Sequence, residues 1–540
     1  MRQATRFHAE AIETVMRSPP IAPHRRALLA LGAALLGVLA CSRSDVPPPR
    51  GIGSGGEPAL EQPLPSASPV PANTPTLAPE PTATETPAAP EPVASPTFPP
   101  TPTLSVGAGS ESVLYRSQPG DALRTVAVRF GVLPEDIAVS GDALPEDAVL
   151  LDPDTLLIIP RRLGANGPAE QVIPDSEVVY SPHAAEFDVS GFVQQAGGYL
   201  QRYRETVSGR SRTGAEVVTL AARDHSVNPR MLLAFLEYYA GWVTNPKQPI
   251  SQVFRYPLGH IAPEAQGLYR QLSWLSNELG EGYYGWRAGS LTELVFPDSS
   301  IVRLAPELNA GTIALQYFFS GRILGREWAE AVSPDGVMAT YRRLFGDPFG
   351  YYHPLYEIGL RQPDLILPFL PGHTWAFTGG PHGAWERESA WAALDFAPST
   401  ILTGCAPSED WVVASAPGLV VRSEAGVVVL DLDGDGREQT GWTLLYLHVA
   451  GAARVAEGAL VEQGDLLGHP SCEGGTATGT HVHFARKYNG EWILADGPIP
   501  FELSGWVAQG GAKPYQGALV KDGQTVLACP CASYVTYISR

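Results

Sequence analysis

The chain has 540 residues, of which 44% are hydrophobic and 17% charged, and its formal net charge at pH 7 is −19. At roughly 100–200 residues a domain, this length predicts several domains. Nucleic-acid-binding proteins normally carry a basic surface, so the acidic balance predicts no nucleic-acid partner.

The N-terminal segment is predicted to direct export. Residues 28–40 read LLALGAALLGVLA, an apolar run too short for the roughly 20 residues that cross a bilayer. The run ends in Val-Leu-Ala before Cys41, which resembles a bacterial lipobox with valine in place of the usual leucine. The resemblance implies that residues 1–41 are a lipoprotein signal peptide, that Cys41 is lipidated, and that the protein is extracytoplasmic, anchored on a membrane and facing the cell wall. An ordinary signal peptide with an incidental cysteine is the alternative.

Residues 42–110 are predicted to be a linker without a packed core. Of the 51 prolines, 18 lie between Val46 and Ser105, among threonine, alanine and glutamate. In polyproline II geometry, about 60 residues reach on the order of 180 Å, which suits a spacer between membrane and cell wall. A solubilising tail would have the same composition.

Residues 111–163 are predicted to form a compact α+β unit. A short strand at Val113–Tyr115 leads to a turn, and Asp121 is placed to cap the helix that follows. A second short helix is expected near 134–140, and Leu156–Pro160 closes the unit as a strand.

The start Tyr-x-x-x-Pro-Gly-Asp-x-Leu and the end Ile-Ile-Pro of this unit resemble the LysM family, which has the order βααβ. The resemblance implies binding of N-acetylglucosamine-containing glycan, chiefly peptidoglycan, between two loops. The residues that it implies are Gly120, Asp121 and Ala122 in the first loop and Asp152, Pro153 and Asp154 in the second. A retained fold without sugar binding is the alternative.

Residues 164–187 are predicted to be a second linker, and residues 188–360 a helical domain. Ala215–Asp224 is an amphipathic run, and Asn228-Pro229 is a typical start for a further helix.

The string VNPRMLLAFLEYYAGW, which begins at Val227, resembles the catalytic helix of lysozyme-like lytic transglycosylases. Tyr239 stands where that family has its glutamate, and Glu237 lies about 200° away around the helix. The resemblance therefore implies an all-α, lysozyme-like domain that has lost its catalytic residue. Glycan-strand cleavage through Glu237 is the alternative.

Residues 365–540 are predicted to form a mainly antiparallel β domain that binds a metal. Six of the twelve histidines lie between His373 and His483. Because side chains alternate along a strand, His481 and His483 point to the same face. Two histidines and a carboxylate that leave a coordination position open suit a catalytic Zn²⁺.

The fragments around His382, Asp395, His448, His481 and His483 resemble the lysostaphin/LytM-type peptidoglycan metalloendopeptidases. The resemblance implies that His382, Asp395 and His483 hold one zinc ion and that His448 and His481 are catalytic without binding it. It also implies hydrolysis of amide bonds in peptidoglycan.

The sequence departs from this family in one spacing. Twelve residues separate His382 from Asp395, where the family usually has three, so a loop over 383–393 is expected to bridge them. His373 and His469 match no motif and are predicted to be structural. An intact fold that activates another hydrolase, without catalysis of its own, is the alternative to an enzyme.

The run Asp431-Leu-Asp433-Gly-Asp435 resembles a calcium-binding loop. Trp442 stands at the twelfth position, where such loops need a glutamate, so the sequence favours a tight Asp-Gly hairpin turn and no calcium.

The cysteines other than Cys41 are free to pair in an exported chain. Cys405, Cys472, Cys529 and Cys531 allow three connectivities. Since Cys529 and Cys531 are so close in sequence, bridges from them to Cys405 and Cys472 are favoured. A structural zinc held by all four is the alternative.

Overall fold

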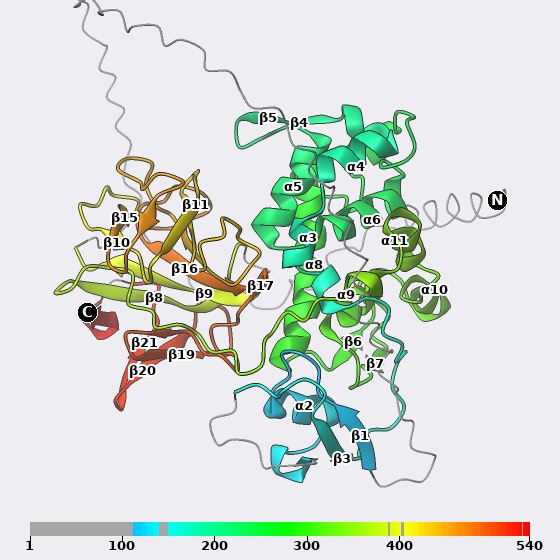
Figure 1. The fold of residues 1–540 in the computed structure, drawn as a ribbon, viewed down its shortest axis with the longest axis horizontal. Helices are drawn as coiled ribbons and strands as arrows, with labels where there is room; N and C mark the ends of the chain where they lie inside the picture. The colour runs from blue at the N-terminus through cyan, green and yellow to red at the C-terminus, as the bar shows by residue number, and fades with distance from the viewer. Residues whose placement is uncertain (1–111, 140–148, 387–388, 401–403, 532) are drawn as a thin grey trace, which may run out of the picture. The chain divides into compact units, whose positions relative to one another are not determined.

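The computed structural model describes residues 112–139, 149–386, 389–400, 404–531 and 533–540 (Figure 1). The predictions of a signal peptide, of lipidation at Cys41 and of a proline-rich linker concern residues outside these ranges. The described residues belong to the compact unit Leu104–Arg540. Within them, no helix is both long enough and apolar enough to span a membrane.

The N-terminal unit is a small antiparallel sheet in the order β1-β3-β2, covered by α2. Its elements are β1 (Ser112–Arg116), α2 (Leu123–Phe130), a 3-10 turn η1 (Pro134–Asp136), β2 (Ala138–Val139) and β3 (Leu156–Pro160). The prediction of a second helix near 134–140 is wrong for the part described, because only one 3-10 turn forms before the strand β2. Burial of Ile137 and the pairing of Val139 with Leu157 favour extended backbone there.

The middle domain is mainly helical. Its helices are α3 (Pro182–Ala185), α4 (Val189–Ala196), α5 (Gly214–His225), α6 (Pro229–Ala240), α7 (Ser251–Arg255), α8 (Leu268–Ala288), α9 (Ala310–Ser320), α10 (Gly325–Ala331) and α11 (Val337–Phe345). The prediction of an all-α domain is wrong, because the domain also contains two antiparallel hairpins. These pair β4 (Arg204–Val207) with β5 (Arg210–Thr213) and β6 (Glu293–Val295) with β7 (Ile301–Arg303).

The ends of α6 follow from local sequence. The Asn228 side chain accepts a hydrogen bond from the Arg230 amide at 2.9 Å, and Pro229 takes the first helical position. Gly241 ends the helix in the left-handed conformation, with φ of 65°. The predicted helix start at Asn228-Pro229 is therefore confirmed.

The predicted linker over 164–187 is wrong in its second half. Val172, Ile173 and Val178 are buried in the core of the helical domain. The segment also contains the 3-10 turn η2 (Asp175–Glu177) and α3. Burial of these apolar side chains makes the segment a part of the helical domain.

The C-terminal domain is built on a large antiparallel sheet in the order β14-β11-β12-β13-β16-β9-β8-β22, with β17 added beside β16. The strands are β8 (Thr374–Gly383), β9 (Trp391–Pro398), β11 (Gly418–Glu424), β12 (Val427–Asp431), β13 (Trp442–Leu447), β14 (Leu460–Val461), β16 (Val482–Tyr488), β17 (Glu491–Trp492) and β22 (Tyr537–Ser539).

Smaller sheets complete this domain. The strand β10 (Val412–Val413) pairs with β15 (Leu466–Gly468), and a further sheet runs in the order β18 (Glu502–Leu503), β19 (Trp506–Gly510), β20 (Gly517–Lys521) and β21 (Gln524–Leu527).

The helical domain covers one face of the large sheet. Alternate side chains of β12, β13 and β16 join the helical core, namely Val427, Val429, Leu445, Leu447 and Ala485. Their neighbours Val428, Leu430, Leu444, Tyr446 and Phe484 form the core on the opposite face. Buried polar contacts also join the domains: Arg422 lies 3.0 Å from the Asp224 carboxylate, and Ser226 donates to the Gly490 carbonyl at 2.6 Å. The strand alternation places Asp395 and His483 on the face toward the helical domain.

The disulfide pairing differs from the favoured prediction. Cys405 pairs with Cys472, and Cys529 pairs with Cys531. Cys405 and Cys472 lie in loops that meet where Gly404 pairs with Gly479, whereas Cys529 follows β21 and donates its amide to the Phe377 carbonyl. The fold separates the two pairs of cysteines, which sequence distance did not indicate, and the pairing rules out a zinc site made of all four.

Candidate metal centre

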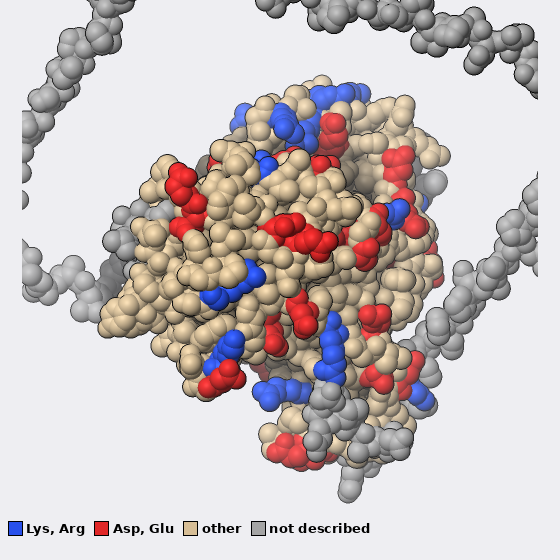
Figure 2. Space-filling model, turned by 60° about the vertical axis from the view of Figure 1, so that its left-hand side comes forward, with Lys and Arg blue, Asp and Glu red and all other residues tan. Residues whose placement is uncertain are grey.

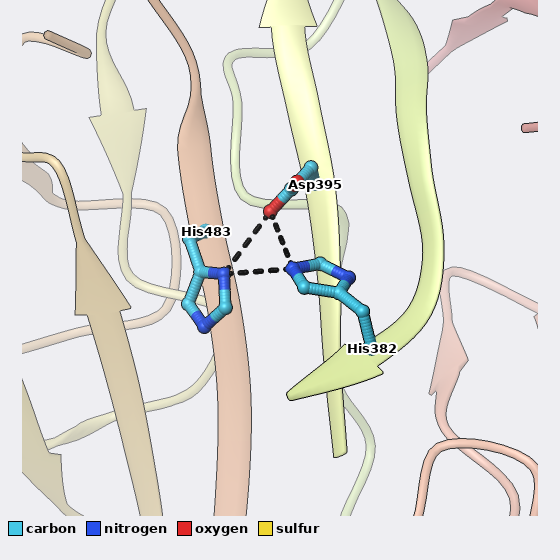
Figure 3. A group of neighbouring side chains, drawn as sticks. All are labelled: His382, Asp395 and His483. Carbon is cyan, nitrogen blue, oxygen red and sulfur yellow. Dashed lines mark hydrogen bonds and ion pairs between the residues drawn. The ribbon is translucent and has the colours of Figure 1, made fainter. Parts of the chain in front are cut away.

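Three strands bring His382, Asp395 and His483 together (Figure 3). His382 is near the end of β8, Asp395 lies in β9, and His483 lies opposite Asp395 in the register of β16. His382 Nε2 is 3.0 Å from His483 Nδ1, and each of these nitrogens is 3.2 Å from Asp395 Oδ1. The predicted ligands therefore form one buried cluster.

The long segment between His382 and Asp395 forms a β-hairpin. The strands β8 and β9 are antiparallel neighbours, and only residues 384–390 lie between them. The predicted loop over 383–393 is therefore too long, since Trp391 and Ala393 belong to β9. Register shifts on both sides of His382 bring its side chain toward Asp395.

Backbone carbonyls fix the tautomer of both histidine ligands. His382 Nδ1 is 2.7 Å from the Gly380 carbonyl, and His483 Nε2 is 2.9 Å from the Ala384 carbonyl. A carbonyl only accepts hydrogen bonds, so each of these nitrogens carries the proton. The other nitrogens, His382 Nε2 and His483 Nδ1, therefore carry lone pairs, which face each other and the Asp395 carboxylate.

This donor set fits Zn²⁺. Two imidazole lone pairs and a carboxylate converge at 3.0–3.2 Å, with no proton between them. Tetrahedral ligands at about 2.0–2.1 Å from zinc are about 3.3 Å apart. Without a cation, the lone pairs would repel one another, so the cluster is arranged to hold a positive ion.

The protonation states suit metal binding. Burial alone raises the pKa of Asp395, but His382 and His481 outweigh this and hold that pKa well below its usual range. Burial lowers the pKa of His483, and Asp395 offsets only part of the effect. An ionised carboxylate and a neutral imidazole are the forms that ligate zinc.

His448 and His481 lie beside the cluster, and their rings are 4.5 Å apart. His448 Nδ1 donates to the Glu473 carbonyl at 2.8 Å, and His481 Nδ1 donates to the Gly479 carbonyl at 2.7 Å. Each Nε2 is therefore free of the backbone, and that of His481 lies 3.7 Å from Asp395 Oδ1. His448 also has a left-handed backbone with φ of 68°, which is rare outside glycine and recurs at functional sites.

Tyr515 is a site residue that the sequence did not indicate. Its ring stacks on His382, with ring centres 4.1 Å apart, and its amide donates to the Pro381 carbonyl at 3.2 Å. Tyr515 lies between β19 and β20, more than a hundred residues after His382 and outside any motif. Stacking of this kind fixes the plane of the imidazole.

His373 and His469 lie apart from the metal cluster. His373 Nδ1 is 3.2 Å from the Asp410 carboxylate, whereas His469 Nδ1 donates to the Asp410 carbonyl at 2.8 Å. His469 also packs on Trp411. These contacts are those of structural histidines.

The first predicted glycan loop is covered. The Asp121 carboxylate is buried, accepts a hydrogen bond from Tyr115 at 2.6 Å and pairs with Arg129 at 2.7 Å. The prediction that Asp121 caps α2 is wrong, because these partners hold the carboxylate inside the unit. Ala122 is buried as well, and a side chain at Gly120 would meet Arg287 at 2.5 Å.

The second predicted glycan loop is more open. Pro153 is half-buried, whereas Asp152 and Asp154 are exposed. Asp154 has φ of 66°, and its carbonyl accepts a hydrogen bond from Arg116 at 3.2 Å. Of the two loops, this one leaves side chains accessible to a glycan.

The Glu237 side chain accepts hydrogen bonds at the C-terminal end of its own helix, α6. Its carboxylate accepts hydrogen bonds from the amides of Val243 and Thr244, both at 3.0 Å, and from the Thr244 hydroxyl at 2.5 Å. These donors belong to the chain that follows α6. They give Glu237 a structural role as an acceptor for otherwise unpaired amides.

The aspartates after β12 form a wider turn than predicted. The connection to β13 runs over residues 432–441, so it is not a tight Asp-Gly hairpin. Asp431 accepts hydrogen bonds from the amides of Asp433, Gly434 and Gly436, which shapes the loop. Burial raises the pKa of Asp431 to about 6. The prediction that no calcium binds here stays a prediction.

Residues 171–355 match the family model described as LasA, N-terminal domain. This part of the chain is therefore similar to the N-terminal domain of LasA. The chain is 26% identical over 305 residues to Protease LasA of Pseudomonas aeruginosa, in the strains UCBPP-PA14 and PAO1. The match spans 51% of this chain and 66% of the LasA relatives, so it leaves about a third of their length outside.

Solved structures with some likeness to this chain include metallopeptidases. The M23 metalloprotease pseudoalterin is 22% identical with a TM-score of 0.26, over 31% of this chain and 96% of that one. The catalytic domain of lysostaphin from Staphylococcus simulans is 20% identical with a TM-score of 0.17, over 23% and 89%. Both TM-scores lie below 0.5, and no functional inference follows from them.

Proposed function

We propose that this chain is a zinc-dependent endopeptidase that hydrolyses amide bonds in the stem peptides or crosslinks of peptidoglycan. One observation carries the proposal: His382 Nε2, His483 Nδ1 and Asp395 Oδ1 converge at 3.0–3.2 Å. Two more histidines, His448 and His481, stand next to this centre. A structural zinc site would use all its positions for protein ligands, whereas three ligands leave one for water or substrate.

When bound, Zn²⁺ supplies Lewis acidity that polarises a scissile carbonyl and makes water a better nucleophile at neutral pH. His448 is the group placed to accept a proton. Burial, with His481 and His483, lowers the pKa of His448 to about 3, so its Nε2 is a free lone pair at neutral pH. We assign His448 the role of taking the proton of the attacking water at Nε2 and delivering one to the leaving amine.

His481 is placed for a different role. It is more exposed than His448, and its Nε2 faces the Asp395 carboxylate at 3.7 Å. In its doubly protonated form, in which Nδ1 still donates to the Gly479 carbonyl, His481 would donate a hydrogen bond from Nε2 to the carbonyl oxygen as negative charge develops there. The carbonyls of Glu473 and Gly479 keep both rings oriented for these tasks.

The choice of peptidoglycan as substrate rests on the sequence. The LysM-like N-terminal unit implies glycan binding, for which we propose the loop that contains Pro153 and Asp154. We also propose that Cys41 is lipidated and holds the protein outside the cytoplasm. On the face drawn in Figure 2, the basic side chains of the described residues lie among acidic ones, which suits a partner other than nucleic acid.

We also propose that the helical domain is lysozyme-like and does not cleave glycosidic bonds. Glu237 is held by three hydrogen-bond donors at the end of α6, which disfavours a role as general acid. An activator protein without catalysis is the remaining alternative. It is disfavoured because a protein of that kind has no need of three metal donors and two oriented histidines.

The test is mass spectrometry of material released from purified sacculi. The wild-type chain would be compared with His481→Ala, with a chelated sample and with His469→Ala as a matched control outside the site. We expect new free amino termini with wild type and His469→Ala, and none with His481→Ala or after chelation. Intact sacculi in every sample would refute peptidoglycan cleavage by this chain, and anhydro-sugar ends would instead indicate glycan-strand cleavage.

A further inference from the structure

The disulfide Cys405–Cys472 lies next to the carbonyls that orient the two unliganded histidines. Glu473 directly follows Cys472, and its carbonyl accepts a hydrogen bond from His448 Nδ1 at 2.8 Å. Gly404 directly precedes Cys405 and pairs in parallel with Gly479. One covalent bond therefore joins the two short segments that support His448 and His481.

The contact at Gly404 leads directly to His481. The Gly404 carbonyl accepts a hydrogen bond from the Thr480 amide at 2.9 Å, and the Thr480 hydroxyl donates to the Ala406 carbonyl at 2.5 Å. These bonds hold Thr480, the residue that directly follows Gly479, and the Gly479 carbonyl accepts a hydrogen bond from His481 Nδ1. The segment 404–406 is thus the support of the Gly479 carbonyl.

Besides the disulfide, polar contacts at the surface hold these segments: the Glu473 carboxylate accepts a hydrogen bond from the Gly451 amide at 2.9 Å, and the Glu473 amide donates to the Ser471 hydroxyl at 3.0 Å. Residues 404–407 and 473–476 are exposed, and none of their side chains enters a hydrophobic core. The metal ligands differ, because His382, Asp395 and His483 lie in or at the end of paired strands and are buried. Loss of the disulfide should therefore loosen the histidine supports and leave the metal donors in place.

We propose that the Cys405–Cys472 disulfide is a positioning device that sets the orientation and tautomer of His448 and His481. The proposal rests on the endopeptidase function above, but its structural part does not. The disulfide closes a loop of 67 residues that includes β10 to β15, so it fixes the histidine supports relative to β9 and β16. It acts through Glu473 and Gly479 and does not touch the reacting atoms.

The experiment compares the chain carrying Cys405→Ser and Cys472→Ser with a matched control carrying Cys529→Ser and Cys531→Ser. The control removes the disulfide after β21, which supports no histidine of the site. We expect kcat to fall about 10- to 100-fold in the first variant, because small displacements of catalytic groups have effects of this size. KM should stay within about twofold, zinc content should stay at that of wild type, and the control should keep its kcat.

A second readout does not depend on peptidase activity. Long-range ¹⁵N–¹H spectra of histidine-labelled chain report the tautomer of each ring. We expect His448 and His481 to be protonated at Nδ1 in wild type and in the control, and to show mixed tautomers without Cys405 and Cys472. If no variant cleaves sacculi but the tautomers change, the proposed function fails and the positioning role stands.

If the first variant does not fold, reduction of the folded control chain answers the same question, since this chain retains only the Cys405–Cys472 bond. A phosphine reductant converts the bond into two thiols and is itself oxidised to the phosphine oxide, with water supplying the oxygen and the two protons. Loss of kcat on reduction with zinc retained supports the proposal. An unchanged kcat and unchanged tautomers, in the variant or after reduction, would overturn it.

Discussion

His382 Nε2 lies 3.0 Å from His483 Nδ1, and the other nitrogen of each ring donates a hydrogen bond to a backbone carbonyl. Two lone pairs at this distance repel each other unless a cation lies between them. The β8–β9 hairpin and the β9–β16 register impose the approach, so the strand pairing itself builds the proposed metal site. This relationship leads to specific expectations for metal binding.

Replacement of a ligand should remove the metal. We expect His483→Ala to weaken zinc binding by more than the roughly 10- to 100-fold that loss of an outer hydrogen-bond partner costs. His469→Ala, the control, should bind zinc like wild type because His469 contacts Asp410 and Trp411 instead. Calorimetric titration of both variants with zinc measures this, and equal affinities would contradict the assigned ligand set.

Removal of the metal should destabilise the C-terminal domain. Zinc binds the folded site and stabilises it by mass action, by about 2.7 kcal/mol when free zinc is at 100 times its Kd. A chelator should therefore lower the thermal midpoint of wild type, and it should leave that of His483→Ala almost unchanged. Scanning calorimetry with and without chelator makes the comparison, and equal shifts in both chains would show that chelation acts elsewhere.

Glu237→Ala should reduce stability and leave the cleavage products unchanged. The substitution leaves the Val243 and Thr244 amides without their acceptor, which costs about 1–3 kcal/mol for each buried group left unsatisfied. Urea unfolding measures the loss. Anhydro-sugar ends that are formed by wild type and absent with Glu237→Ala would show that the glycosidase alternative is right.

The contact between Glu424 and Arg223 should make stability depend on pH in the acid range. Burial raises the pKa of Glu424, but Arg223, Arg422 and Arg210 outweigh it and lower that pKa below its ordinary value. A lowered folded pKa gives a contribution that is complete above the unfolded value of about 4.3 and is lost as the pH falls through the folded value. Glutamate and arginine are here partly exposed, so the pair is worth about 0.2–1 kcal/mol.

Glu424→Gln should therefore flatten the acid limb of the stability curve. Its free energy of unfolding should fall less than that of wild type between pH 5 and pH 3, while the two curves run parallel above pH 6. Urea unfolding at a series of pH values gives both curves. Parallel curves throughout would show that Glu424 does not titrate abnormally.

Substitutions of Asp121 and Asp154 should have different effects on the N-terminal unit, the first on its stability and the second on its binding to sacculi. Asp121→Ala leaves Arg129 buried without its partner and should cost about 3–5 kcal/mol in local stability. Asp154→Ala should keep the unit folded and weaken adsorption to sacculi. Hydrogen exchange of β1 and β3 reports the first effect and cosedimentation with sacculi the second. Full adsorption by Asp154→Ala would remove this loop from the proposed glycan site.

Local sequence predicted those parts of the fold that local interactions decide. Asn228, Pro229 and Gly241 mark the ends of α6, and the alternation of His481 and His483 placed both on one face. That His382, Asp395 and His483 lie together was also predictable, because motifs identified these residues even though the spacing from His382 to Asp395 was unusual. The hairpin explains that spacing.

Other features depend on contacts that no local pattern encodes. The buried segment around Val172 reads as a linker because its apolar run is short and its partners in the helical domain lie far along the chain. The prediction of the disulfides from sequence distance was wrong. Cys405 pairs with Cys472 because two loops meet at Gly404 and Gly479. Tyr515 stacks on His382 from the connection between β19 and β20, which carries no sequence motif.

The most direct test of the central claim is the dependence of cleavage on zinc. Chain stripped of metal by a chelator would receive zinc in steps, and new amino termini released from purified sacculi would be counted at each step. The account predicts no cleavage without zinc, a linear rise to a plateau at one zinc per chain, and no recovery by His483→Ala. Cleavage that persists in the stripped chain, or that His483→Ala recovers in full, would contradict it.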